Sequence, residues 1–288
     1  MLLVTPAAGQ VFPLDHVIAA GTSGGIDGER AARISAGSTR VDDPAANSVD
    51  ATGNATAADA ASALMAPDTP VYYALSQGTD VYHSMSADTA FVSLEFQEPV
   101  SVLSFHGPWL HIRTRGGSVG YVRSAFMSDV WIRVVKSKKT VYVYRGETLE
   151  SEIPADMAYN FFADKKERGD ARRPDHWRTP EGRFYVVARN PDSQFHRAWV
   201  LNYPTPADAD RGLKAGLINQ TEFQQIRNAA ATFRPPPMGT ALGGFIEIHG
   251  SGTGTRTSWT RGCVAIPNAE MDRLWDIVKV GTPVVVEP

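Results

Sequence analysis

The sequence predicts a mainly β protein in which a small barrel precedes a larger β domain that carries inserted helices. Two observations lead to this prediction. From residue 70 onward, short runs rich in Val, Ile, Leu, Tyr, Phe and Trp recur about every ten residues, separated by turns that contain Gly or Pro. Helical periodicity, in contrast, is confined to short segments of the C-terminal half.

Residues 1–69 carry neither pattern and are expected to be a disordered tail or linker. Gly, Ala, Ser, Thr and Asp dominate this segment, and aromatic residues are almost absent. Such a composition buries too little apolar surface to offset the entropy of an ordered chain. The first residues are apolar, but Pro6, Gly9 and Pro13 interrupt them and no Lys or Arg precedes Arg30, so a signal peptide is not evident.

The sequence pattern of residues 70–129 predicts the small barrel. Gly-Pro and Gly-Gly pairs mark its turns. The expected strands are Thr79–Tyr82, Ala90–Leu94, Val100–Leu103, Trp109–Arg113 and Gly120–Val122.

The larger domain is expected at residues 130–288. Two β-rich runs flank a polar turn of four residues and are expected to form a hairpin. The expected strands of this domain are Trp131–Val135, Thr140–Tyr144, Phe184–Val187, Ala198–Leu201 and Val284–Val286.

Two helices are expected in the larger domain. The first opens with a capping box at Thr221 and Gln224 and ends before a run of prolines. The second is expected to have Asn268 as its cap. Its apolar positions, at i, i+3, i+4 and i+7, are Met271, Leu274, Trp275 and Val278.

The bulk composition excludes several classes of protein. The formal net charge is −3, and no Lys/Arg-rich stripe interleaves with aromatic residues, so nucleic-acid binding is not expected. No apolar run is long enough for a transmembrane helix. The oligomeric state is not predictable from these data.

The pair of His249 and Cys263 is the strongest chemical feature of the sequence. Cys263 is the only cysteine among 288 residues, so it has no partner for an internal disulfide or a multi-cysteine metal site. His249 precedes it by fourteen positions, across a loop rich in Gly, Ser and Thr. A cysteine with a histidine base is the minimum set for thiolate catalysis, and it requires neither a metal nor another cofactor.

The local pattern also predicts the geometry of this pair. His249 is expected at the end of a strand, on the face opposite Ile246 and Ile248. An imidazole close to the sulfur would lower the pKa of the thiol. No acidic residue soon follows His249, so the carbonyl of Gly250 is a candidate to orient the ring.

Gly262 is expected to have a role different from that of His249 and Cys263. The backbone N–H groups of Gly262 and Cys263 are candidate donors to the oxyanion of a tetrahedral intermediate. A lone cysteine is nevertheless often a small buried hydrophobe. The residues by themselves therefore leave a catalytic and a structural role open.

The segment around these residues resembles the catalytic domain of L,D-transpeptidases of the YkuD type. The motif is His249-Gly250, a spacer, and Thr260-Arg261-Gly262-Cys263. The likeness continues upstream and downstream in Tyr159–Phe161, Asp164–Asp170, Arg178–Tyr185, Leu201–Pro204 and Gly281–Val284.

This resemblance implies a β-sandwich-like fold, no metal, and a thioester acyl-enzyme formed on peptidoglycan stem peptides in the cell envelope. Cys263 would be the nucleophile, His249 the base, and the Gly250 carbonyl the group that orients the imidazole. The resemblance also suggests that Gly262 and Thr260 support the oxyanion and that Arg261 and Trp259 contact the substrate. Residues 70–129 separately resemble the bacterial SH3-like (SH3b) modules of cell-wall enzymes.

Two features depart from the commoner family pattern. Many members have a histidine where this chain has Arg261 and an arginine where it has Ala265. The variant in this chain resembles a sub-branch that includes hydrolytic relatives, so both transfer and hydrolysis are expected as candidate activities. The second departure is an insertion, Ala171–Arg178, which is expected to be either a solvated charged loop or a patch for substrate carboxylates.

Three other readings compete with this one. Papain-like cell-wall peptidases place the cysteine before the histidine, and no histidine follows Cys263. Sortases follow the order His, Cys, Arg, but Arg273 falls on the expected amphipathic helix, where an exposed charge is the simpler role. The third reading is a non-catalytic wall-binding protein, and the presence of both Cys263 and His249 weakens it.

Overall fold

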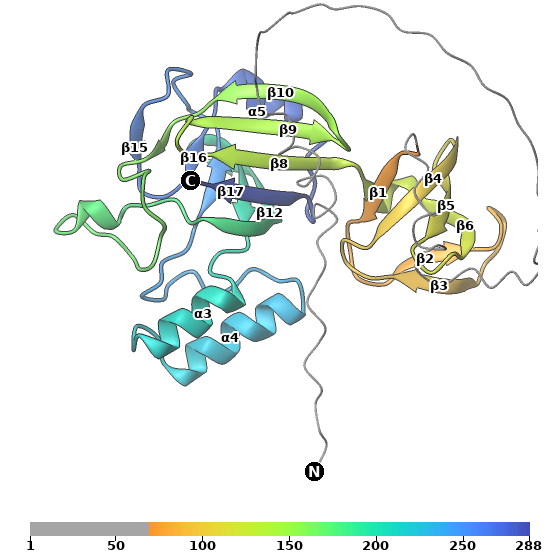
Figure 1. The fold of residues 1–288 in the computed structure, drawn as a ribbon, viewed down its shortest axis with the longest axis horizontal. Helices are drawn as coiled ribbons and strands as arrows, with labels where there is room; N and C mark the ends of the chain where they lie inside the picture. Colours follow the sequence, from red (N-terminus) through yellow and green to blue (C-terminus); the bar gives the residue numbers. More distant parts are fainter. Residues whose placement is uncertain (1–68) are drawn as a thin grey trace, which may run out of the picture.

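The computed structural model describes residues 69–288 (Figure 1). The expected disordered tail therefore lies outside the described residues, except for its last position. Strands dominate the described part of the chain, which contains three α-helices, and the predicted mainly β fold is confirmed. No helix of this part is long and apolar enough to cross a membrane.

The first sheet contains seven strands in the order β3-β2-β6-β5-β4-β1-β7, and all its ladders are antiparallel. Each of the five expected strands is present, and the assignment of this unit as SH3-like stays a prediction. The elements are β1 (Val71–Ala74), β2 (Thr79–Tyr82), β3 (Ala90–Leu94), β4 (Pro99–His106), β5 (Trp109–Thr114), β6 (Val119–Arg123), η1 (Ser124–Phe126) and β7 (Met127–Ser128). Its core is made by Ala74, Val81, Leu94, Val100, Val102, Leu110, Ile112, Val122 and Met127.

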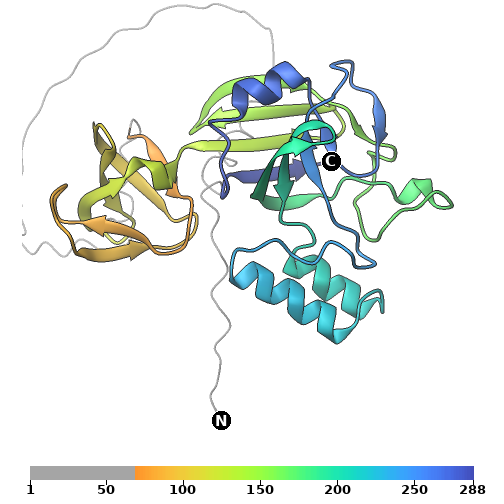
Figure 2. The same cartoon turned by 180° about the vertical axis from the view of Figure 1, so that it is seen from behind.

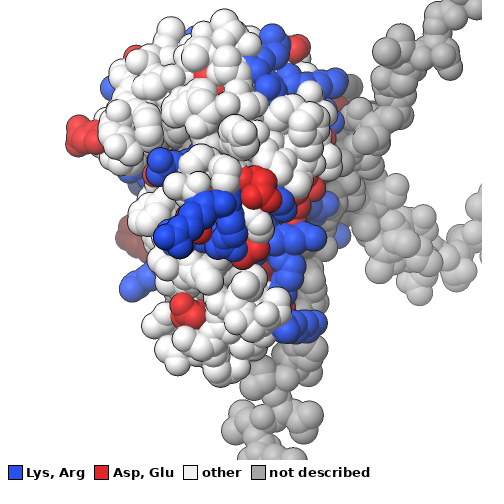
Figure 3. Space-filling view, turned by 90° about the vertical axis from the view of Figure 1, so that its left-hand side faces the viewer, with Lys and Arg blue, Asp and Glu red and all other residues white. Residues whose placement is uncertain are grey.

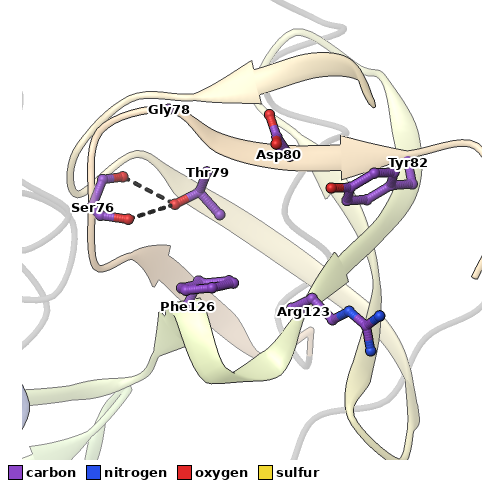
Figure 4. Close-up of a pocket in the computed structure, with 7 residues that line it drawn as sticks. All are labelled: Ser76, Gly78, Thr79, Asp80, Tyr82, Arg123 and Phe126. Atoms are coloured by element: carbon purple, nitrogen blue, oxygen red, sulfur yellow. Dashed lines mark hydrogen bonds between the residues drawn. The ribbon is translucent and has the colours of Figure 1, made fainter. Parts of the chain in front are cut away.

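This unit carries a cavity of about 150 Å³ between β2, β6 and η1 (Figure 4). Phe126 and Arg123 face Thr79 and Tyr82 across it, and Asp80 lies at its rim. The Arg123 guanidinium stacks over the ring of Trp109, 3.8 Å from its centroid.

The second sheet contains eight strands in the order β10-β9-β8-β17-β12-β13-β14-β16. The β8/β17 and β14/β16 pairs are parallel, and the other neighbours are antiparallel. The predicted hairpin is formed by β8 and β9. The strands are β8 (Val130–Val135), β9 (Thr140–Arg145), β10 (Thr148–Pro154), β12 (Gly182–Ser193), β13 (His196–Leu201), β14 (Glu247–His249), β16 (Val264–Ala265) and β17 (Pro283–Glu287).

Two short strands, β11 (Met157–Ala158) and β15 (Ser258–Thr260), form a separate parallel pair beside this sheet. The eight-stranded sheet curls around one core, with Trp199 among its largest fully buried side chains. Residues from both ends of the sheet contribute to that core, including Val141 and Val143 of β9 and Ile248 and Val264 of the β14/β16 pair.

Helix α5 (Asn268–Leu274) packs Met271 and Leu274 into the same core. The view from behind shows this blue helix lying across the large sheet (Figure 2). The sequence predicts Asn268 as the cap of this helix, and that is wrong. The N-cap position is Pro267, and no side chain caps the helix. The Asn268 Oδ1 instead accepts a hydrogen bond from the backbone N–H of Ser251, at 2.6 Å.

Helices α3 (Pro206–Lys214) and α4 (Gln220–Ala231) lie side by side beneath the sheet (Figures 1 and 2). The expected helix is α4, but its capping box is made by Asn219 and Glu222, two positions before the expected pair. Helix α3 is not among the expected elements. Its sequence signal is Thr205, which forms a capping box with Asp208, followed by Pro206 at the first helical position.

The two sheets contact each other through a few specific residues. The buried Gln97 of the first unit donates from Nε2 to the carbonyl of Gly281, at 3.0 Å. The Phe96 ring packs against Tyr185, with ring centroids 4.9 Å apart. Gly281 has a φ of 95°, and a Cβ there would lie 2.4 Å from the Leu75 carbonyl oxygen, so only glycine fits this joint.

Candidate active site

The strands β14 and β16 bring His249 and Cys263 to one face of the sheet. In their parallel register, Ile248 pairs with Val264 and His249 pairs with Ala265, and Cys263 directly precedes β16. Side chains alternate along a strand, so Glu247, His249 and Cys263 share a face. Ile248 and Val264 point to the other face, into the core, which agrees with the orientation expected from the sequence.

His249 is almost completely buried, with 1% of its surface exposed. Its Nδ1 lies 2.7 Å from the carbonyl oxygen of Gly250. A carbonyl only accepts hydrogen bonds, so Nδ1 carries the proton in the neutral ring and Nε2 keeps a free lone pair. A Cβ at Gly250 would lie 2.6 Å from Asn268 Oδ1 and 2.7 Å from the Phe195 carbonyl, so only glycine fits here.

Two aromatic side chains hold the imidazole in place. Phe195 stacks on it, with centroids 4.5 Å apart and an interplanar angle of 22°. Trp259 approaches it edge-on, at 6.0 Å. Burial lowers the pKa of His249, although the hydrogen bond to Gly250 and the charge of Asp156 act in the opposite direction. The ring is therefore neutral at neutral pH and able to accept a proton.

Asp156 organises the loop after His249, and sequence reasoning missed it. Its Oδ1 accepts hydrogen bonds from the Thr253 hydroxyl and the Thr257 N–H, at 2.8 and 2.9 Å. Its Oδ2 accepts from the Thr253 N–H and from the Trp259 indole, at 2.8 and 2.9 Å. Burial alone would raise the pKa of Asp156, and these hydrogen bonds from Thr253, Trp259 and Thr257 bring it below its ordinary value.

The thiol of Cys263 makes its hydrogen bond to the backbone and not to the imidazole in this structure. Its Sγ donates a hydrogen bond to the carbonyl of Phe245, at 3.3 Å. Burial raises the pKa of the Cys263 thiol to about 12; the charge of Glu247 raises it too, and the Glu247 N–H and the Lys165 ammonium lower it. The structure thus shows a neutral thiol beside a neutral imidazole, whereas the sequence predicted a thiol pKa lowered by the histidine.

The backbone around Cys263 is fixed by Thr260 and Gly262. The Thr260 hydroxyl donates to the Cys263 carbonyl at 2.6 Å, and the buried Gly262 N–H points at the same hydroxyl from 3.5 Å. Gly262 has a φ of 142°, and a Cβ there would lie 2.9 Å from Ile246 Cδ1. Of the two expected oxyanion donors, only the Cys263 N–H has no acceptor within the described part of the chain.

Arg261 and Trp259 lie at the surface of the site. The Arg261 guanidinium sits 5.0 Å above the ring of Trp177, a residue of the inserted segment. Trp259 is partly exposed and is anchored below by Asp156. Both side chains are thus available at the rim, and Arg261 ties the rim to the insertion.

The inserted segment carries a short 3-10 helix, η2 (Pro174–His176), and its charges pair with acidic residues just before it. Arg173 forms ion pairs with Glu167 at 2.9 Å and with Asp170 at 3.3 Å, and His176 lies 2.9 Å from Glu167. Figure 3 looks onto the left-hand side of the molecule in Figure 1. Lys and Arg side chains gather in the middle of that face, next to Asp and Glu. This pairing favours the solvated loop over the carboxylate-binding patch. Across residues 69–288, no group of three His, Cys, Asp or Glu side chains could hold a metal ion.

A family model described as the L,D-transpeptidase catalytic domain (YkuD) matches residues 129–286. Among solved structures, the chain is similar to an L,D-transpeptidase from Xylanimonas cellulosilytica, with 18% identity and a TM-score of 0.34 over 55% of this chain and 60% of that one. It is also similar to an L,D-transpeptidase from Mycobacterium smegmatis, with 15% identity and a TM-score of 0.32 over 62% and 67%.

A third solved structure, Bd1075 of Bdellovibrio bacteriovorus, is 25% identical, with a TM-score of 0.32 over 55% of this chain and 47% of that one. The chain thus covers about half to two thirds of the length of these structures. A comparison with curated proteins gave no match.

Proposed function

This chain belongs to the L,D-transpeptidase (YkuD) catalytic domain family, and on that premise we propose that it forms a thioester acyl-enzyme at Cys263 on peptidoglycan stem peptides. One observation carries the proposal. The Nδ1–H of His249 donates a hydrogen bond to the Gly250 carbonyl, and His249 lies on the same face of the sheet as Cys263. The ring orientation leaves Nε2 as the basic atom. The proposed place of action is the cell envelope, where stem peptides are found.

The proposed reaction starts from the neutral pair. Rotation of the Cys263 side chain away from the Phe245 carbonyl brings Sγ toward His249 Nε2, which takes the thiol proton as Sγ attacks a stem-peptide carbonyl carbon. The Cys263 N–H is the available donor to the oxyanion. The C–N bond then breaks, and the leaving amine receives the proton from the imidazolium, so that a neutral imidazole and a thioester remain.

The second half of the reaction has two candidate acceptors. An amine of another stem peptide would give transfer, and water would give hydrolysis; in either case His249 takes the proton of the attacking group and returns it to the sulfur. We keep hydrolysis as a candidate activity for two reasons. The Arg261 guanidinium lies over the ring of Trp177, and Ala265, where many relatives have arginine, is fully buried. Product masses after incubation with defined muropeptides, with and without an added amine, decide between the two.

Substitution of the nucleophile tests the acyl-enzyme itself. Cys263→Ala is expected to lower turnover of tetrapeptide-bearing muropeptides by about a thousandfold or more while the thermal unfolding midpoint is kept. His249→Gln is expected to act similarly, because glutamine offers no basic nitrogen. Unchanged turnover in Cys263→Ala would show that the thiol is not the nucleophile.

We further propose that residues 70–129 form an SH3-like module that binds the cell wall or orients the substrate. The cavity between β2, β6 and η1 supports this, since it combines aromatic and charged walls. Retention of the full chain on purified sacculi is the test. Phe126→Ala, which alters the cavity wall, should reduce retention. Phe105→Ala, a change at a similarly exposed phenylalanine outside the cavity, should not. Equal retention of the two variants would count against this site.

A further inference from the structure

The larger domain buries two lysines, and their surroundings differ. Lys136 is fully buried, and its Nζ bonds the Glu181 carboxylate at 2.6 Å and the carbonyls of Ala163 and Thr179 at 2.9 and 3.3 Å. Lys165 is also buried, at only 3% exposure, but its Nζ lies beside Gly243, where a Cβ would be 3.5 Å from it. A buried ammonium is unfavourable unless an anion or hydrogen-bond acceptors compensate for its lost hydration.

The surrounding backbone holds Lys165 firmly. Its carbonyl accepts a hydrogen bond from Arg211 Nη2 at 3.0 Å, and the neighbouring Arg168 N–H donates to the Ala241 carbonyl at 2.7 Å. The end of the side chain fits against Gly243, where a Cβ would lie 3.0 Å from Lys165 Cε and 3.5 Å from Nζ. Gly243 has a φ of 93°, which favours glycine, so the bend and the space for the ammonium are made by the same residue.

The bend at Gly243 is followed closely by a residue that contacts the Cys263 thiol. Two residues after Gly243, the carbonyl of Phe245 accepts the hydrogen bond from Cys263 Sγ. Phe245 has a φ of 53°, an unusual conformation for a large side chain, and it turns its carbonyl toward the sulfur. One short segment, residues 243–245, therefore contacts the ammonium of Lys165 at one end and the thiol of Cys263 at the other.

We propose that Lys165 is a positioning residue whose ammonium stabilises the Cys263 thiolate once the thiol proton has moved to His249. This inference rests on the proposed role of Cys263 as the nucleophile. Lys165 keeps its own proton throughout: the proton that leaves Sγ is held by His249 Nε2, and no bond to Lys165 forms or breaks. The cation lowers the free energy of a buried anion that Glu247, on the same face, would otherwise destabilise.

The charges around the two groups are consistent with this role. Burial lowers the pKa of Lys165 to about 8; among the nearby charges Cys263 acts first, to raise it, then Arg168 and Arg178 lower it and Asp164 raises it. Lys165 therefore carries its proton at neutral pH and loses it in mildly alkaline solution.

The rate at which iodoacetamide alkylates the full chain as a function of pH tests the proposal, because Cys263 is the only thiol and no turnover is needed. Lys165→Met removes the charge at similar volume, and it should raise the apparent pKa of the thiol by about one unit, which slows alkylation about tenfold at neutral pH. Lys166→Met, a change at the exposed neighbouring lysine, should leave the rate unchanged.

The shape of the profile separates this role from a packing role. In the unaltered chain, the rate should rise less steeply above about pH 8, where Lys165 loses its charge. Lys165→Met should lack this change of slope. Lys165→Arg keeps a permanent charge, so its rate should stay closer to that of the unaltered chain. Thermal unfolding of each variant shows whether the fold is kept.

Two results would overturn the proposal. One is a Lys165→Met variant that folds and is alkylated with an unchanged pH profile; if its KM for muropeptides also rises, Lys165 pairs with a substrate carboxylate instead. The other is a Lys165→Arg variant that folds but loses as much rate as Lys165→Met, which would indicate shape rather than charge. Loss of turnover in Cys263→Ala is measured separately, so failure of the proposed function and failure of this inference are distinguishable.

Discussion

The indole Nε1 of Trp259 donates a hydrogen bond to the carboxylate of Asp156, 103 positions away in the sequence, over 2.9 Å. The same indole packs its edge against the ring of His249. A carboxylate that lies outside the His-Gly and Gly-Cys motifs thus fixes an aromatic wall of the site. Asp156 therefore positions part of the site although it lies outside the motifs.

Asp156→Ala is expected to destabilise the chain by about 3 kcal/mol, because several donors lose a charged acceptor in a buried setting. Asp156→Asn should not restore stability. Each carboxylate oxygen accepts two hydrogen bonds, so an amide NH₂ faces two donors in either orientation. Denaturant unfolding measures both changes. Asp272→Ala, at a half-exposed ion pair with Arg197, is the control and should cost well under about 1 kcal/mol.

The contribution of Asp156 should also depend on pH in a defined direction. Its pKa is lowered in the folded state, so the stability it supplies is present above its ordinary value of 3.8 and is lost as the pH falls through the lower folded-state value. The difference in unfolding free energy between the unaltered chain and Asp156→Ala should therefore shrink in acid. A difference that stays constant across this range would contradict the assignment.

The acid limb of the pH profile of kcat/KM is expected below 6.5, the ordinary pKa of histidine, because burial lowers the pKa of His249. Phe195→Ala uncovers one face of the ring, so the limb should move up toward 6.5. Phe162→Ala, a change at a phenylalanine that is 79% exposed, should leave the limb in place. If the acid limb of the Phe195→Ala variant stays at the pH seen in the unaltered chain, the Phe195 ring is not the source of the lowered pKa of His249.

Gly250→Ala is expected to destabilise the chain by about 1 to 3 kcal/mol and to lower activity as well. The added Cβ would collide with Asn268 Oδ1 and with the Phe195 carbonyl, and relief of that collision moves the carbonyl that holds His249 Nδ1. Gly239→Ala is the matched control, since a Cβ there would have no neighbour within 4 Å. Equal unfolding midpoints for the two variants would rule out this crowding.

Lys136→Met is expected to cost about 3 kcal/mol, because it leaves the Glu181 carboxylate without its buried partner. The double variant Lys136→Met with Glu181→Leu should lose less than the sum of the two single changes, since no unpaired charge remains. Lys138→Met, at an exposed neighbour, serves as the control. Unfolding free energies that add simply would show that the two side chains do not stabilise each other.

Period-two alternation and turn residues were sufficient to predict five strands of the first sheet, the strand Trp131–Val135 and the face of the strand on which His249 lies, but not the short strands β1 and β7. Local rules were less reliable at helix ends. Thr221 is a good cap by type, but Asn219 and Glu222 form the capping box, and the side chain of Asn268 bonds Ser251 instead of its own helix. At α4, two neighbouring polar residues satisfy the same rule, whereas at α5 the cap position is taken by Pro267.

Apart from the Gly250 carbonyl, the partners of His249 and Cys263 were not predictable. Asp156 and Phe195 have no periodic or motif signal, and Lys165 lies in a family-like segment without an expected role. Each reaches the site because segments distant in sequence meet in space. The hydrogen bond from Cys263 to the Phe245 carbonyl likewise depends on a positive φ at Phe245 that sequence does not reveal. A motif specifies the reacting atoms, whereas the long-range pairing sets their protonation.

The strand order of the large sheet has a consequence for biosynthesis. Strand β17 joins the hairpin half, β8 to β10, to the half that carries His249, and no other strand of residues 69–288 hydrogen-bonds to both. It also follows the site residues in chain order. The large sheet therefore cannot close before β17 has been synthesised, and until then the nascent chain carries its nucleophile in an unfinished sheet.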